Sequence, residues 1–204
     1  MTKRLVISVA TILLAATSMN TSAGGDVERG AELADTCLGC HGIPGYRNAY
    51  PSYRVPKLGG LDEDYLIIAL QGYKTEMRGH ATMQAQAATL SDQDMKDLAA
   101  FFASQGELEQ GKPRSGAKIS RGQQKAVVCT ACHGQGGVSP TGNWPTLAGQ
   151  HEDYLRNVLG QYKSGARKDP VMAGQAAALT DEDIADLAAY FAAQRGLYTV
   201  AYEN

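Results

Sequence analysis

The chain has 204 residues, of which 23 are glycine, 44% are hydrophobic and 20% are charged. This length suits one large domain or two small ones, and the composition excludes disorder and collagen-like repeats. Nineteen lysines and arginines stand against 21 aspartates and glutamates, which gives a formal net charge of −2. Because no basic excess is available to neutralise phosphates, we do not expect nucleic-acid binding.

The first 23 residues have the pattern of a secretory signal peptide. Lys3 and Arg4 precede an apolar stretch from Leu5 to Ala16, and small polar residues then lead to Ala23. The stretch is about a dozen residues, shorter than the roughly 20 that cross a bilayer. We expect cleavage after Ala23 and export, with an uncleaved N-terminal anchor as the alternative. The mature chain has 17 basic and 21 acidic residues, a net charge of −4.

The four cysteines form two copies of one motif. Cys37-Leu38-Gly39-Cys40-His41 and Cys129-Thr130-Ala131-Cys132-His133 both have the form Cys-x-x-Cys-His, to which a c-type haem is attached. Two thiols on one helical turn can reach the two vinyl groups of a porphyrin, and the following imidazole can bind the iron. We therefore expect two covalently bound haem c groups, attached at Cys37, Cys40, Cys129 and Cys132, with His41 and His133 as iron ligands.

Three other uses of paired cysteines fit this pattern less well. A thioredoxin-like redox pair would begin a helix in a strand-helix-strand pattern and needs no histidine after it. A structural zinc site would join both pairs on one ion, but each pair has its own histidine and about 90 residues separate the pairs. Ordinary disulfides would leave His41 and His133 unexplained.

The sequence contains an internal repeat. Residues 56–105 align without gaps with residues 145–194 at an offset of 89, and 25 of the 50 positions are identical. Identity of this extent indicates a duplication. The haem motifs are offset by 92, so the first copy has three extra residues, within residues 46–53. Residues 46–54 are bulkier and more basic than residues 138–144, and they could form a partner-docking loop.

The repeat predicts an all-α fold of two tandem domains. The domains are residues 24–106 and 117–204, joined by a polar linker at residues 107–116. Each domain is expected to contain three helices. The first runs into the haem motif and is capped near Asp26 in one copy and Ser120 in the other. The second covers residues 63–75 and its repeat. The third begins at a capping box led by Ser91 or Thr180.

The sixth iron ligand separates an electron carrier from an enzyme with an open iron. After His133 the only methionine is Met172 and the only other histidine is His151. His151 stands at the expected start of a helix. Met172 stands in a loop with glycine and proline before the last helix, from which the chain can fold over the haem. We expect Met172 to be the ligand of the second haem.

The first copy offers three candidate ligands in one loop, Met77, His80 and Met83. Only Met83 aligns with Met172 at the offset of 89, so we expect Met83 to bind the first iron, with His80 and Met77 as the alternatives. Met95 belongs to the apolar face of the third helix and is expected in the core.

Charge differs between the halves of the chain. Residues 24–106 contain 7 basic and 11 acidic residues, a net charge of −4, whereas residues 117–204 contain 8 of each. We expect a cationic redox partner to prefer the first domain. Arg78 and Arg167 are aligned in the repeat, and they are candidates to pair with haem propionates unless they are simply solvated.

These residues resemble class I c-type cytochromes, and their tandem arrangement resembles the dihaem cytochrome c4 family. The resemblance is carried by residues 37–42, 129–134 and 145–150, together with Met83 and Met172, and it extends over nearly the whole mature chain. It implies two all-helical class I cytochrome c domains about a pseudo-twofold axis. It also implies that a loop proline accepts the proton of each proximal histidine, either Pro51 or Pro56 and either Pro140 or Pro145.

The resemblance implies a function as well as a fold. It implies a periplasmic electron carrier, not an enzyme, which takes electrons from a bc1-type complex or a dehydrogenase and delivers them to a terminal oxidase. Peripheral membrane association is compatible with this role. Two alternatives are a cytochrome subunit of a larger oxidoreductase, such as flavocytochrome c sulfide dehydrogenase, and a dihaem peroxidase. A peroxidase would need an open iron, and chains of that family are longer.

Overall fold

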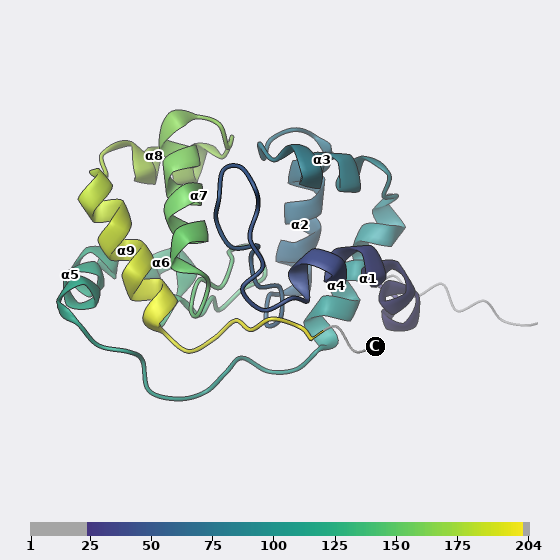
Figure 1. Cartoon of the computed structure of the whole chain (residues 1–204), viewed down its shortest axis with the longest axis horizontal. Coiled ribbons are helices and arrows are strands. Elements are labelled where there is room, and N and C mark those ends of the chain that lie inside the picture. The colour runs from purple at the N-terminus through teal and green to yellow at the C-terminus, as the bar shows by residue number, and fades with distance from the viewer. Residues whose placement is uncertain (1–23, 202–204) are drawn as a thin grey trace, which may run out of the picture.

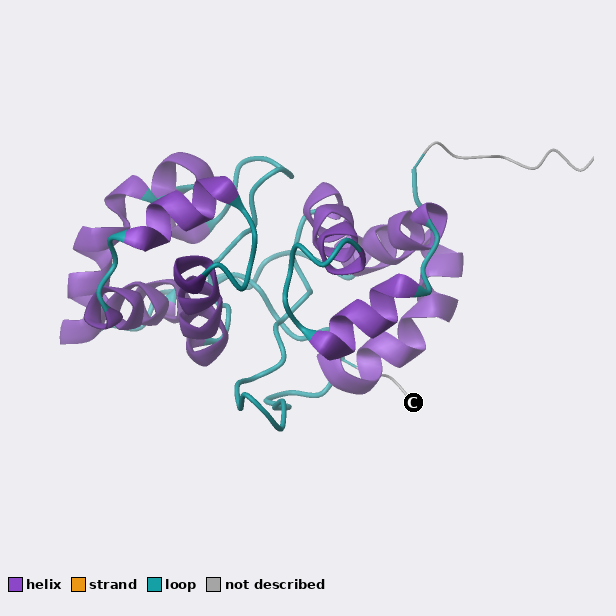
Figure 2. Ribbon diagram, turned by 90° about the horizontal axis from the view of Figure 1, so that it is seen from above, coloured by secondary structure: helices purple, strands orange, loops and turns teal. Residues whose placement is uncertain are grey.

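The computed structural model describes residues 24–201, so the predicted signal segment lies outside the described residues. Within this range the chain forms nine α-helices and two short 3₁₀ helices, and its only β pairing is three isolated bridges. The helices gather into two groups with loops between them (Figure 2). None of the helices in residues 24–201 combines the length and apolar character needed to cross a membrane.

The first group contains the helices that the sequence predicted and one more. Its helices are α1 (Val27–His41), α2 (Glu63–Lys74), α3 (Ala81–Ala88) and α4 (Asp92–Ser104) (Figure 1). Helix α1 begins after Asp26, whose carboxylate accepts from the N–H groups of Glu28 and Arg29. Helix α4 begins at the predicted capping box, in which Ser91 and Asp94 each accept a hydrogen bond from the other's N–H.

The second group repeats this plan, but its first helix is broken. It contains α5 (Ala117–Lys125), η1 (Ala126–Val128), α6 (Thr130–His133), η2 (Gln135–Gly137), α7 (Glu152–Ser164), α8 (Pro170–Ala177) and α9 (Asp181–Ala193). The predicted cap near Ser120 is wrong. Helix α5 begins at Ala117, and the Ser120 hydroxyl donates to the Gly116 carbonyl within the helix instead of capping it. The capping box led by Thr180 is confirmed.

Glycine allows the first and last helices of each group to cross at contact distance. Helix α1 packs on α4, and α5 packs on α9. A Cβ atom on Gly30 would lie 2.0 Å from the Asp97 carbonyl oxygen, and one on Gly122 would lie 2.0 Å from that of Asp186. These distances are far below van der Waals contact, so only glycine fits at either crossing.

The same crossings bury one carboxylate each. Asp97 and Asp186 are the equivalent residues of α4 and α9, and both are almost fully buried. Asp186 accepts two hydrogen bonds from Arg121, both at 2.9 Å, and one from Lys125 at 2.8 Å. Asp97 accepts from Arg29 and from the N–H of Asp26. Each buried charge is thus paired and ties the first helix of its domain to the last.

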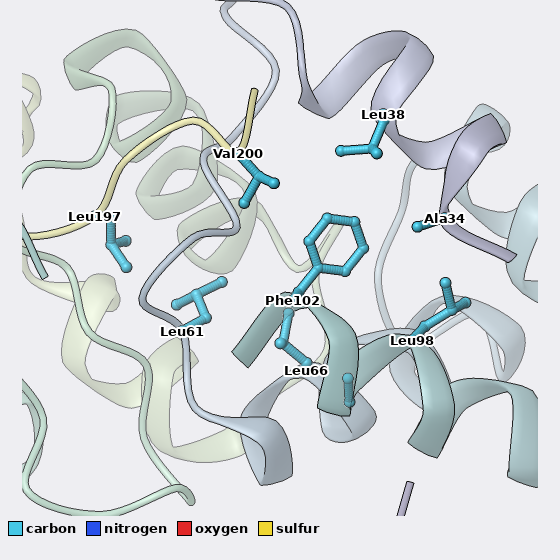
Figure 3. Packing of buried hydrophobic residues seen from close by; sticks show 9 residues of the cluster. Ala34, Leu38, Leu61, Leu66, Leu98, Phe102, Leu197 and Val200 are labelled. Carbon is cyan, nitrogen blue, oxygen red and sulfur yellow. The ribbon is translucent and has the colours of Figure 1, made fainter. Parts of the chain in front are cut away.

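The C-terminal tail returns to the first domain. After α9 the chain runs under the molecule toward α4 (Figure 1), and Tyr198 pairs with Gly59 through two backbone hydrogen bonds of 3.1 Å. Leu197 and Val200 are buried beside Leu61 and Phe102 in the core of the first domain (Figure 3). Part of the segment assigned by sequence to the second domain therefore completes the packing of the first.

Candidate functional site

The first Cys-x-x-Cys-His motif lies at the end of the first helix of its domain, and the second lies after the break in the corresponding helix. Cys37, Cys40 and His41 occupy the last turn of α1. In the second domain the chain turns through η1 before Cys129, and α6 then carries Cys132 and His133. All four cysteines are half-buried, and none forms a disulfide with another. The two motifs lie in different helical groups, which does not fit the zinc alternative, since that site needs both pairs on one ion.

The two motif histidines make the same hydrogen bond. The Nδ1 atom of His41 lies 2.8 Å from the Pro56 carbonyl oxygen, and that of His133 lies 2.9 Å from the Pro145 carbonyl oxygen. A carbonyl can only accept, so Nδ1 carries the proton and Nε2 is left with a free lone pair. Of the proline alternatives in each loop, Pro56 and Pro145 are the acceptors.

Burial keeps both imidazoles in the form that binds iron. It lowers the pKa of His41, and nearby His80 lowers it further against the opposing effect of the Pro56 hydrogen bond. Burial likewise lowers the pKa of His133, which is 5% exposed. A neutral imidazole with a fixed tautomer is a suitable iron ligand.

Met83 and Met172 occupy equivalent positions on two short helices that the sequence did not predict. Met83 is the third residue of α3 and Met172 the third residue of α8, and both side chains are half-buried. The expectation of a loop around Met172 is corrected, because Asp169 caps α8 and Pro170 begins it. The side chain of Asp169 accepts from the Met172 N–H at 2.9 Å. His80 does the same for the Met83 N–H at 3.2 Å.

The alternative candidates for the sixth iron ligand lie in different environments from Met83 and Met172. His80 caps α3 through Nδ1, and His151 stands at the N-terminus of α7, as expected. Met77 is 43% exposed, and its carbonyl accepts from the Lys168 N–H across the two domains. Met95 is fully buried in the core, also as expected.

Two arginines and several tyrosines meet where the domains face each other. Arg78 and Arg167 form an antiparallel backbone bridge. The guanidinium carbon of Arg78 lies 5.2 Å from the Tyr65 ring centre, and that of Arg167 lies 5.2 Å from the Tyr162 ring centre. The two arginines are aligned in the repeat, but no sequence pattern predicts this cluster, because the pairing depends on how the two domains meet.

The arginine cluster provides a test of whether the chain suits a haem. Arg167 is 3% exposed, and its buried Nε has no hydrogen-bond partner in the part of the chain that the structure describes. Among residues 24–201, neither arginine forms an ion pair with a carboxylate. Burying a charge without a counter-charge is costly. Anionic groups from outside the chain would therefore be needed to balance the charge of the two arginines. Haem propionates are such groups, and the residues present fit haem.

Comparisons with known proteins agree with this geometry. A model of the cytochrome c family matches residues 27–106 and, separately, residues 119–194. Cytochrome c4 of Pseudomonas aeruginosa is 34% identical over 180 residues, which cover 82% of this chain and 88% of that protein. The chain belongs to the cytochrome c4 family. It is an all-α protein of two tandem cytochrome c domains that carries two covalently bound haem c groups and acts as an electron carrier.

Two solved structures and one further relative are also similar to this chain. The crystal structure of reduced cytochrome c4 from Pseudomonas stutzeri covers 83% of this chain and 99% of its own, with a TM-score of 0.69 and 30% identity. A thiosulfate dehydrogenase electron acceptor of Stutzerimonas stutzeri is 33% identical over 172 residues, 78% of this chain and 79% of that protein. The thiosulfate dehydrogenase structure from Marichromatium purpuratum gives a TM-score of 0.69 at 28% identity, over 82% of this chain and 40% of that one.

Proposed function

We propose that this member of the cytochrome c4 family is a periplasmic carrier of a respiratory chain, with a histidine and a methionine on each iron. Each haem supplies one-electron chemistry, in which its iron alternates between the ferrous and ferric states. The first haem is held by Cys37, Cys40, His41 and Met83, and the second by Cys129, Cys132, His133 and Met172.

One observation supports the proposal, namely that the aligned candidate ligands of the two halves occupy equivalent positions with equivalent hydrogen bonds. In each half a proline carbonyl fixes the proximal histidine, as Pro56 does for His41. In each half the aligned methionine is the third residue of a helix whose capping side chain accepts from its N–H. Met77 has no counterpart in the second half, where residue 166 is alanine.

The surrounding residues set the redox behaviour. A thioether is a soft, neutral ligand that favours ferrous iron, so His/Met ligation gives a relatively high potential. Arg78 and Arg167 would hold propionate carboxylates at the domain interface. Their positive charge disfavours the ferric state of a nearby iron and raises its potential further.

Leucine substitutions of the three methionines test the ligands. Met83→Leu should remove the weak far-red sulfur-to-iron band of the first haem, lower its midpoint potential and open its iron to cyanide. Met172→Leu should do the same for the second haem. Met77→Leu is the matched control and should leave both haems unchanged. Loss of the band on replacing Met77, or its full retention on replacing Met83, would contradict the assignment.

Export and charge support the proposed partners. The pattern of residues 1–23 supports cleavage after Ala23 and a periplasmic location, where a bc1-type complex or a dehydrogenase would be the donor and a terminal oxidase the acceptor. The net charge of −4 on residues 24–106 favours a cationic partner there. With a basic monohaem cytochrome c as probe, the association rate should fall steeply between 20 and 200 mM salt, ~tenfold or more. A rate independent of salt would oppose this docking.

The thiosulfate dehydrogenase matches support a second candidate, in which the chain accepts electrons from a dehydrogenase that binds it stably. Flavocytochrome c sulfide dehydrogenase is another assembly of this kind. Purification of the native protein under mild conditions separates the two candidates. A free chain supports the mobile carrier, whereas co-purification of a catalytic subunit at equal stoichiometry supports the subunit role. Reduction of the isolated chain by thiosulfate dehydrogenase and thiosulfate would identify that donor class.

A further inference from the structure

The three extra residues of the first copy lie in a short hairpin that stands between the domains. The hairpin spans residues 46–55 and rises between α2 and α7 (Figure 1). It is closed by hydrogen bonds from Val55 N–H to the Tyr46 carbonyl, 2.8 Å, and from Asn48 N–H to the Tyr53 carbonyl, 2.9 Å. Arg47 and Arg54 form an antiparallel bridge, so their side chains leave from paired positions.

Both arginines of the hairpin reach one carboxylate of the second domain. Arg47 Nη1 lies 3.0 Å from Asp153 Oδ2, and Arg54 Nη1 lies 3.7 Å from Asp153 Oδ1. The Arg54 N–H also donates to Asp153 Oδ2 at 3.2 Å. Asp153 is the second residue of α7, where the helix dipole also favours a negative charge. Asp153 is therefore held by a backbone donor and two guanidinium groups of the other domain.

Tyr53 extends this contact toward the ligand helix of the first domain. Its side chain is 5% exposed, and its ring centre lies 6.1 Å from that of Tyr154 on α7. On its other side, Tyr53 meets the His80 ring edge-on at 6.3 Å. His80 caps α3, which carries Met83. The hairpin thus connects the ligand helix of one domain to α7 of the other.

We call the contacts of Arg47 and Arg54 with Asp153 the clamp. The equivalent place in the repeat has no such contacts among the described residues. Asp64 is the aligned residue of α2, is exposed, and forms no ion pair within the described part of the chain. It faces Gly142, where an added Cβ atom would lie 2.8 Å from the Asp64 Cβ atom. The second domain therefore offers backbone, and no cation, to the helix that corresponds to α7.

We propose that Arg47, Arg54 and Asp153 are positioning residues that hold the two haem domains in one orientation for electron exchange between them. This inference rests on the proposed function, because it requires two haems that exchange electrons. The rate of electron transfer falls exponentially with the separation of the centres. A clamp that narrows the range of domain orientations keeps this rate high without touching either iron.

The test compares Asp153→Asn with Asp64→Asn in the haem-loaded full chain. Both variants remove one negative charge at the same place in the repeat. Pulsed dipolar EPR of the fully oxidised protein gives the distribution of iron-to-iron distances, and NMR exchange in the half-reduced protein gives the rate between haems. We expect Asp153→Asn to widen the distribution at least twofold and to slow the exchange at least fivefold. Asp64→Asn should leave both the width of the distance distribution and the exchange rate close to those of the parent chain.

A second variant removes the clamp from the other side. Arg47→Gln combined with Arg54→Gln should reproduce the effect of Asp153→Asn, and adding Asp153→Asn to it should change nothing more. Absorption spectra and midpoint potentials should stay close to those of the parent chain. An exchange rate in Asp153→Asn equal to that of Asp64→Asn would overturn the proposal, as would loss of methionine ligation in Asp153→Asn. Failure of the proposed function would appear separately, as a parent chain without two low-spin haems.

Discussion

The main chain of Gly122 lies directly against that of Asp186, at a place where a Cβ atom would stand 2.0 Å from the Asp186 carbonyl oxygen. Gly30 and Asp97 repeat the contact in the first domain. This close crossing brings the basic residues of the first helix within reach of the buried carboxylate. It also fixes the direction in which that helix leads to its haem motif.

An alanine at this crossing should therefore destabilise the second domain. We expect Gly122→Ala to lower the free energy of unfolding by about 1–3 kcal/mol, since backbone must shift to admit the methyl group. Gly160→Ala is the control, because Gly160 is inside α7 and, apart from the backbone of that helix, nothing in residues 24–201 lies within 4 Å of its Cβ position. That change should stabilise the chain by about 0.5–1 kcal/mol through helix propensity. Urea unfolding of both variants checks the difference, and equal effects would contradict the packing.

The returning tail predicts that a residue after the second repeat, in the segment assigned to the second domain, stabilises the first domain. Leu197 is fully buried in the first domain's core, so Leu197→Ala should cost about 2–5 kcal/mol. Val127→Ala is the exposed control and should stay within about 0.5 kcal/mol of the parent. Hydrogen exchange measured by mass spectrometry should show the loss in α1 and α4. A loss confined to α5 and α9 would refute the role of the tail.

The arginine cluster predicts an electrostatic effect on the potentials. Arg167→Gln removes a buried positive charge and should lower at least one midpoint potential by tens of millivolts, an effect on the order of 1 kcal/mol. Arg156→Gln is the control, since Arg156 lies on exposed surface of α7. Redox titration of the two variants gives the comparison. Unchanged potentials in Arg167→Gln would mean that the cluster serves packing alone.

The carboxylate of Asp94, in the first turn of α4, should make the folded protein less stable in acid. Hydrogen bonds from the Ser91 hydroxyl and N–H, and then from Arg29, lower the pKa of Asp94 to about 2 from its ordinary 3.8. The folded state thus binds fewer protons than the unfolded state between these values. The stabilisation is complete above about pH 4 and is lost as the pH falls toward 2. Asp94→Asn should flatten this part of the pH profile of thermal stability, and an unchanged profile in that variant would contradict the role of Asp94.

Local patterns in the sequence were sufficient to predict much of the structure. The capping boxes at Ser91 and Thr180 mark helix starts through contacts within three residues, so they are visible without the fold. The repeat likewise favours Met83 over Met77 as the candidate ligand, and this choice, which depends only on alignment, stays a prediction. The spacing of the haem motifs also predicted two haems, which the family match confirms.

Features that depend on the meeting of distant segments could not be predicted. Helices α3 and α8 have eight residues each and little apolar periodicity, so local signals were few: the caps at His80 and Asp169, and Pro170 at the start of α8. The choice of Pro56 and Pro145 required the path of the loops. Leu197 returns to the first domain, and the clamp joins Asp153 to Arg47. Both involve partners about a hundred residues away, and no local pattern encodes such pairs.

A redox titration of the mature, haem-loaded chain, with absorption spectra at each potential, is the decisive test of the ligands on the two irons. We expect two low-spin haems at relatively high potential, both with the weak methionine-sulfur band in the far red. A low-potential haem without that band would place His80 on the first iron, and a high-spin haem would indicate an open site. Either result would contradict the assignment of a histidine and a methionine to both irons.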